Sequence, residues 1–333
     1  MNPENTMTWE EANQTYLMRE LDRVRALLER RSAQSRMEPE QLASESVADS
    51  PRLDDMNPPP SIERLCRAFG LSRFERDILL LCAGVELDAS FSRLITATQT
   101  GVAGAYPTFS LALSTFSEAH WSALSPGGPL RRWRLIEVGG ESLTQSRIRI
   151  DERVLHYLAG VAHLDERLNG LLEEVAVPAE LAQSHRVQAD PVVRLWTASG
   201  ADVPPIVQLC GNEAQSKREI AATACAQLGL YLYALAASAL PAHPAELDAL
   251  IRLWQREAIL CGSGLLIESG EGEHADAARE IALNRLLQEV RGILIVSGRT
   301  RRGNLQRAMV TFDVEKPTTE EQRHMWRCYL GTV

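Results

Sequence analysis

Residues 204–229, PPIVQLCGNEAQSKREIAATACAQLG, join a short apolar run to a helix-forming segment through a polar turn. A phosphate-binding loop of the form G-x-x-x-x-G-K-[ST] occupies the same place between a strand and a helix. Gly211 and Lys217 have the spacing of that loop, while Ser216 stands where its second glycine belongs and Arg218 where its hydroxyl residue belongs. The stretch therefore predicts a phosphate loop in its fold, with an altered chemistry.

The two substitutions bear on the chemistry directly. Glycines let backbone N–H groups turn inward around phosphate, so Ser216 is costly if that position needs a glycine-only conformation. Arg218 cannot ligate Mg²⁺ and brings a positive charge to the place of the cation. Lys217 is one of only two lysines among 35 basic residues, which makes chance a weaker explanation for its place at the loop's lysine position than it would be in a lysine-rich chain.

The sequence after the loop alternates apolar runs with amphipathic segments. This alternation predicts an α/β fold in which a parallel sheet is covered by helices on both faces. The predicted strands are 206–210, 230–235, 264–269, 292–298 and 309–314, and the predicted helices are 216–229, 244–262, 276–290 and 318–331.

Three further positions complete the candidate site. Glu268 ends the third predicted strand, where a carboxylate could hold Mg²⁺, and Ser269 stands at the place of a catalytic glutamate. A hydroxyl is no general base at neutral pH, so ATP hydrolysis by this chain alone is not expected. Ser297, at the end of the fourth strand, is either a contact to a terminal phosphate or an ordinary turn residue.

The N-terminal part of the chain is helical by pattern. Residues 1–35 contain a helix opened by the capping-box residues Thr8 and Glu11, and 36–60 form an acidic, proline-containing linker. Residues 61–200 contain short helices and a predicted hairpin at 130–138 and 146–151, an order typical of a winged helix.

Within that region, 117–124 would be the recognition helix of a winged helix, and 164–200 are predicted to return to helix. Asp165 is expected on a solvated helix face. Residues 201–333 form the predicted α/β domain.

Composition narrows the function classes. No apolar stretch approaches the roughly 20 residues of a membrane span, and the N-terminus lacks the pattern of a signal peptide, so a cytoplasmic protein is expected. The six cysteines are scattered without a C-x-x-C pair, which favours free thiols. A net charge of −9 disfavours nucleic-acid binding, although five arginines gather around the predicted hairpin.

From about residue 200 to 331 the order of motifs resembles the large subdomain of an AAA+ ATPase, without the helical lid. The stretches SIERLCRAFGLSRFERDILLLCAGVELD, AHWSALSPGGPLRRWRLIEV and IRIDERVLHYLAG resemble the N-terminal region of bacterial AAA+ proteins associated with contractile, phage-tail-like injection systems. Those proteins carry a degenerate first AAA+ module followed by an intact one.

The resemblance implies a degenerate AAA+ module that acts in assembling or remodelling such a machine. Its positions for phosphate and metal contact map onto Gly211, Lys217 and Glu268, with ATP or ADP and Mg²⁺ as the implied ligands. The implied partners are machine proteins or AAA+ subunits, and without a lid the chain is not expected to form a stable hexamer. A winged-helix nucleic-acid-binding protein and a pure protein-docking scaffold remain the alternatives.

Overall fold

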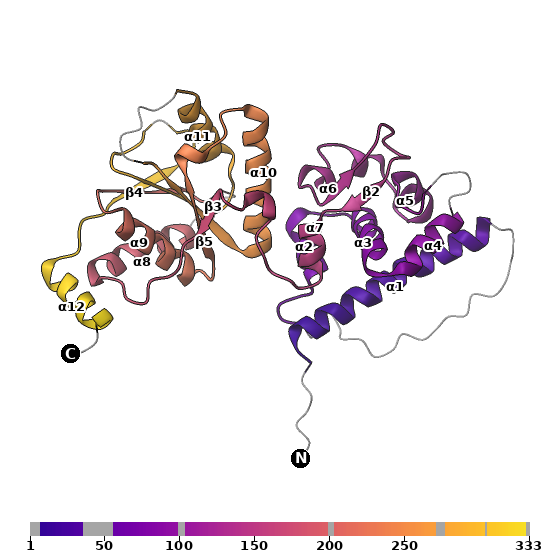
Figure 1. Cartoon of the computed structure of the whole chain (residues 1–333), viewed down its shortest axis with the longest axis horizontal. Helices are drawn as coiled ribbons and strands as arrows, with labels where there is room; N and C mark the ends of the chain where they lie inside the picture. The colour runs from indigo at the N-terminus through magenta and orange to yellow at the C-terminus, as the bar shows by residue number, and fades with distance from the viewer. Residues whose placement is uncertain are drawn as a thin grey trace, which may run out of the picture. The chain divides into compact units, whose positions relative to one another are not determined.

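The chain folds into two compact units, Met1–His163 and Leu164–Val333, in a computed structural model (Figure 1). The structure describes residues 7–35, 56–98, 104–198, 203–270, 277–303 and 305–330. Most of the predicted linker, 36–55, lies outside these ranges. Residues 164–200, which the sequence groups with the winged-helix region, lie in the second unit because their strand and helix join its sheet and core.

A long first helix, α1 (Trp9–Ser35), packs against the third, fourth and fifth helices of the first unit. Its predicted capping box is present, since the Thr8 N–H donates to Glu11 and the Glu11 N–H donates to the Thr8 hydroxyl. The apolar residues that recur at helical spacing along this helix are all buried: Tyr16, Leu17, Leu21, Val24 and Leu28. The remaining helices are α2 (Ser61–Phe69), α3 (Arg73–Leu87), α4 (Ala89–Thr98), α5 (Phe109–Thr115), α6 (Pro129–Arg132) and α7 (Glu152–Leu158).

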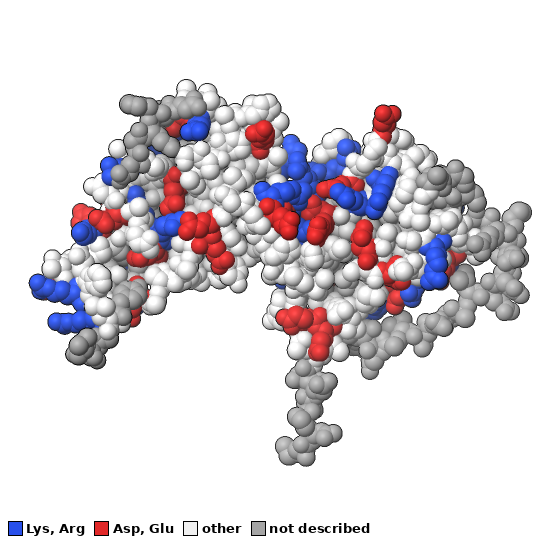
Figure 2. All heavy atoms as spheres, in the orientation of Figure 1, with Lys and Arg blue, Asp and Glu red and all other residues white. Residues whose placement is uncertain are grey.

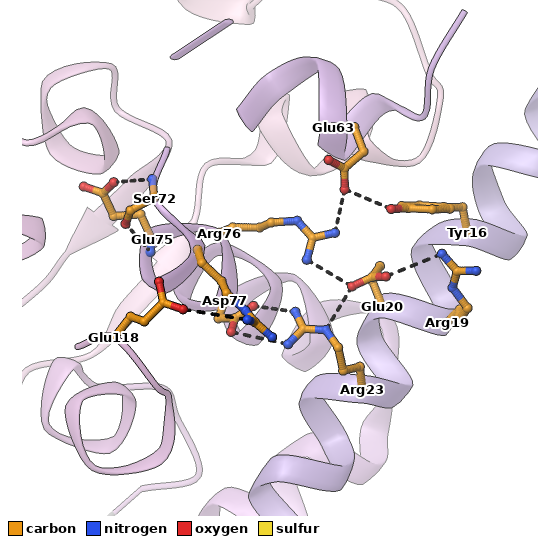
Figure 3. Close-up of polar contacts among 11 residues, drawn as sticks. Tyr16, Arg19, Glu20, Arg23, Glu63, Ser72, Glu75, Arg76, Asp77 and Glu118 are labelled. Atoms are coloured by element: carbon orange, nitrogen blue, oxygen red, sulfur yellow. Dashed lines mark hydrogen bonds and ion pairs between the residues drawn. The ribbon is translucent and has the colours of Figure 1, made fainter. Parts of the chain in front are cut away.

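A half-buried network of charged side chains ties α1 to α2 and α3 (Figure 3). Arg76 of α3 donates to Glu20 of α1 at 3.0 Å and to Glu63 of α2 at 2.7 Å. Arg23 bridges Glu20 and Asp77. Although burial opposes ionisation, the guanidinium groups of Arg76 and Arg23 hold the pKa of Glu20 below its ordinary value. The network therefore fixes how α1 lies on its neighbours.

The predicted hairpin is present as two short antiparallel strands, β1 (Ile136–Val138) and β2 (Ile148–Ile150). Its first strand, predicted over 130–138, is shorter than expected because the Pro129–Arg132 segment forms the helix α6. Glu137 lies opposite Arg149 and forms an ion pair with it, which suits an exposed cross-strand position. The predicted recognition helix is reduced to a 3₁₀ turn, η2 (Trp121–Leu124), which begins after His120 and ends before the Ser125–Gly128 turn.

The second unit is built on a six-stranded sheet of order β3-β5-β6-β7-β4-β8. Every pairing is parallel except that of β3 with β5, which is antiparallel. The strands are β3 (Leu172–Glu174), β4 (Ile206–Cys210), β5 (Tyr231–Ala236), β6 (Ser263–Glu268), β7 (Leu294–Gly298) and β8 (Met309–Asp313). The five predicted strands are confirmed; β3 falls where the sequence predicts helix.

Helices cover both faces of this sheet, as the alternating pattern predicts (Figure 1). One face packs against α8 (Gln183–Ala198) and α9 (Ala214–Gln227), and the other against α10 (Pro244–Cys261) and α11 (Ala277–Glu289). Val207 and Ile295 point into the first core, whereas Ile267 and Val296 point into the second. None of the helices in the described ranges is long and apolar enough to cross a bilayer.

The strand order creates a switch point between β4 and β7. From β4 the chain crosses past β7 and β6 to β5, whereas from β7 it crosses past β4 to β8. The connections after these two neighbouring strands therefore run in opposite directions. In open α/β sheets the crevice for ligands lies outside the carboxyl ends of such a strand pair.

One carboxylate anchors the last helix, α12 (Thr319–Leu330), to the start of α8. Glu321 accepts from the Ser184 N–H at 2.7 Å and from the Thr318 N–H at 2.8 Å. These backbone donors lower the pKa of Glu321 from 4.5 to about 2.

Because this pKa is lowered on folding, the anchor stabilises the fold above pH 4.5 and is lost as the pH falls towards 2. We expect the hydrogen-exchange protection of the Ser184 amide to fall by about tenfold over this window, the value of a lost helix cap. In Glu321→Gln the protection should be low throughout and independent of pH. Equal protection at pH 5 and pH 2 in the unsubstituted protein would contradict this assignment.

Candidate functional site

The turn after β4 is shorter than a phosphate loop requires. β4 ends at Cys210 and α9 already begins at Ala214, with Glu213 as its N-cap residue. The Lys217 N–H donates to the Glu213 carbonyl at 3.2 Å, so it takes part in the first helical turn. The sequence predicted this helix from Ser216. Residues that would encircle phosphate are thus coiled into the helix.

Gly211 lies where three strand ends converge. Its φ is +146°, and its N–H donates to the Gly298 carbonyl at the end of β7. A Cβ at this position would stand 2.1 Å from the Val314 carbonyl oxygen. Glycine is required here by close backbone packing within the protein, a reason unrelated to phosphate.

Lys217 lies at the carboxyl ends of β4 and β7, and its ammonium group is hydrogen-bonded within the protein. Its Nζ donates to the Gly211 carbonyl at 2.7 Å and to the Gly298 carbonyl at 2.9 Å. The residue is only 4% exposed, and burial lowers the pKa of its ammonium group. The ammonium therefore ties the ends of β4 and β7 together.

Arg218 is held by two carboxylates from different strands. Its Nε donates to Glu268 of β6 at 3.0 Å, and its terminal nitrogens donate to Glu173 of β3 at 2.6 and 3.2 Å. Hydrogen bonding to Arg218 lowers the pKa of Glu173 and keeps its carboxylate charged. The carboxylate predicted to ligate Mg²⁺ is thus paired with an internal cation.

The three serines of the candidate site are arranged around these strand ends. Ser216 is buried in the first turn of α9, and Ser297 is buried in β7 beside Glu268 of β6. The Ser269 N–H donates to the Ser297 carbonyl at 2.9 Å, while the Ser269 hydroxyl is buried without a hydrogen-bond partner in the described part of the chain. The topology therefore brings Gly211, Lys217 and the end of β7 together.

Glu173 is the site residue that the sequence did not reveal. It sits in a three-residue strand with no alternating pattern, and its pairing with β5 is what places it opposite Arg218. No signal within residues 172–174 could have found it. Over the described ranges, no group of three or more His, Cys, Asp or Glu side chains could hold a metal ion.

The arginines around the hairpin of the first unit are partly used within the protein. Arg131 donates to the Leu124 carbonyl, Arg132 stacks over the Trp133 ring at 5.1 Å, and Arg149 pairs with Glu137. Figure 2 shows acidic and basic side chains interspersed on the face of this unit that is in view. This mixture is poorly suited to a phosphate backbone.

Comparisons with known proteins bear on the two units differently. A family model described as "Winged helix domain, variant" matches residues 10–172. A solved structure titled "Structure of Rhizobiales Trip13" shares 17% identity at a TM-score of 0.27, covering 50% of this chain and 70% of that one. A likeness this weak carries no argument about fold or function. No curated protein matches the chain.

The winged-helix prediction for the N-terminal region is therefore confirmed, while the AAA+ assignment of the second unit stays a prediction. The chain combines a region similar to a variant winged-helix domain with a mostly parallel sheet covered by helices.

Proposed function

We propose that this chain is a nucleotide-independent docking module of the AAA+ kind. In it, the segment that corresponds to a phosphate loop holds two strand ends together and does not bind nucleotide. The observation that carries the proposal is the internal use of the loop's lysine. Lys217 donates to two backbone carbonyls that join β4 to β7, and it is almost fully buried there. A lysine so engaged has to break both bonds before it can reach a phosphate.

The neighbouring groups support the same reading. Arg218 occupies the space between Glu268 and Glu173, so the carboxylate that would hold Mg²⁺ already has a cation. Glu213 places a further carboxylate at the N-terminus of α9, where a phosphate would approach. Each of these features opposes a bound triphosphate, and together they favour a structural role for the turn between β4 and α9.

The resemblance to AAA+ proteins of contractile injection systems extends the proposal to a partner class. The chain would act by binding proteins of that machine, or AAA+ subunits, during assembly or remodelling. Light scattering of the purified chain mixed with the purified sheath protein of such a system tests this extension. A complex supports it, and separate elution of the two at about 100 µM contradicts it.

Calorimetric titration with ATP and ADP, with and without Mg²⁺, tests the proposal itself. We expect no binding at millimolar nucleotide. Lys217→Met should cost about 1–3 kcal/mol of unfolding free energy, since it removes two hydrogen bonds to backbone carbonyls, and within the described residues only the Gly298 carbonyl keeps a second donor, the Gly211 N–H. Lys316→Met is the matched control, because Lys316 is exposed. Micromolar nucleotide binding that disappears in Lys217→Met would contradict the proposal.

A further inference from the structure

The two edges of the sheet in the second unit differ in how they are protected. β3 is three residues long and carries two glutamates, Glu173 and Glu174. Its short length and its charges both protect this edge from pairing with another strand. β8, at the opposite edge, runs for five residues and contains no proline, lysine or arginine. Its register with β4 continues without a bulge from Met309 to Asp313. Among the residues that the structure describes, no strand pairs with the outer side of β8. An edge of this kind is a template for pairing with another chain.

The hydrogen bonds between β8 and β4 determine which backbone groups of β8 point away from the sheet. At one end the Ile206 N–H donates to the Ala308 carbonyl, and at the other the Val314 N–H donates to the Cys210 carbonyl. In a parallel pair, alternate residues face the partner strand. The backbone groups of Val310 and Phe312 therefore face β4, while those of Met309, Thr311 and Asp313 point away from the sheet. The outward carbonyl of Asp313 already accepts one hydrogen bond, from the Gln188 side chain of α8 at 3.0 Å, and has a second lone pair for a partner strand.

The side chains along this edge suit a strand partner. Val310 is 36% exposed, and Phe312 lies at the margin of the core under α8 and α9. The single charge of the strand, Asp313, is paired with Arg301 at 2.5 Å. The edge thus offers apolar contacts with its charge already neutralised.

We propose that β8 pairs with β8 of a second copy of this chain, antiparallel and centred on Thr311. In that register the outward-facing residues meet one another: Thr311 lies opposite Thr311, and Met309 opposite Asp313. The two copies of Asp313 are kept apart, and Val310 lies opposite Phe312, an apolar cross-strand pair. The strand is therefore complementary to itself under two-fold symmetry, the commonest symmetry of soluble oligomers.

This dimer goes beyond the proposed docking function and stands independently of it. It uses the opposite side of β4 from the bond between Lys217 and β7, so a nucleotide-binding chain could form it equally well.

Sedimentation equilibrium of the full chain between about 1 and 100 µM tests the pairing. We expect the mass to rise towards twice that of one chain. Thr311→Pro removes the outward N–H of residue 311. Because each of the two copies donates one such hydrogen bond, the substitution should raise the dimer dissociation constant on the order of 10- to 100-fold. Thr311→Ala keeps that N–H while losing the side-chain bond to Gln208, and should stay within about threefold of the unsubstituted chain.

A crosslink keeps the test decisive if the proline variant fails to fold. Hydrogen-bonded antiparallel partners have Cα atoms about 5.5 Å apart, within reach of a disulfide. In a Cys328→Ser background, which removes an exposed thiol, Thr311→Cys should give a covalent dimer on mild oxidation. A single-chain mass at every concentration, or a dimer that Thr311→Pro leaves equally tight, would overturn the proposal.

Discussion

Replacing Gly211 by alanine is expected to destabilise the second unit by about 4 kcal/mol, among the largest effects of any single methyl group. Two costs add at this position. The φ of +146° is a conformation that an L side chain rarely adopts. The new Cβ would also stand 2.1 Å from the Val314 carbonyl oxygen, which belongs to backbone and cannot rotate away. Relief of the clash requires β4 and the segment after β8 to move apart.

Gly292→Ala is the matched control for this experiment. Gly292 also has a positive φ, +103°, but a Cβ there would meet nothing within 4 Å. It should cost only the backbone strain, about 1–2 kcal/mol. The urea midpoint of each variant, at constant m-value, gives the two free energies. Equal losses for Gly211→Ala and Gly292→Ala would show that the close approach to Val314 is relaxed in solution.

Arg256→Met should cost about 3–5 kcal/mol, because it removes one partner of a buried charge cluster. Arg256 of α10 is fully buried between Asp165 and Glu257, whose side chains are 3% and 1% exposed. Because methionine has a similar volume, the loss of unfolding free energy reflects the removed charge more than an empty cavity. The Glu257 carboxylate would be left in the core beside the 164–168 segment that Arg256 holds.

The same substitution at Arg285 provides the comparison. Arg285 pairs with Asp248 and Glu289 on the surface, with 36% of its side chain exposed. Arg285→Met should therefore change the unfolding free energy by less than about 1 kcal/mol. Adding Glu257→Gln to Arg256→Met should recover part of the loss. An additive loss in the double variant would contradict the role assigned to Arg256.

The sequence predicts the regular parts of this fold well, because periodicity and capping act locally. The alternation after residue 205 locates five strands and four helices, and the Thr8–Glu11 capping box marks the start of α1. Ser72 and Glu75 match the same capping-box pattern and form it at the start of α3. These signals depend on neighbours within one helical turn.

Features set by distant contacts are the ones that the sequence misses. The three residues of β3 become a strand only because β5 supplies a partner. Asp165, expected on a solvated helix face, is buried because Arg256 of α10 reaches it from ninety-one positions away. The sequence therefore could not locate the boundary at residue 164.

The candidate site shows the same division. Its residues are found by motif spacing, and the structure places Gly211 and Lys217 at the switch point. Spacing could not reveal that the Lys217 ammonium donates its hydrogen bonds to backbone carbonyls, or that Glu173 and Glu268 both pair with Arg218. Both facts arise from the order of strands in the sheet, which no local pattern encodes.

Because the chain has only two lysines, the accessibility of the Lys217 amine can be measured directly. Brief acylation of the folded chain with an amine-reactive reagent, read by peptide mass spectrometry, compares Lys217 with Lys316, the only two lysines. We predict that the exposed Lys316 is modified while Lys217 stays protected, with or without millimolar MgATP, and that both react alike in urea. Lys217 reacting at a rate comparable to Lys316, and becoming protected when MgATP is added, would show an open phosphate site and contradict the structural role proposed for the loop.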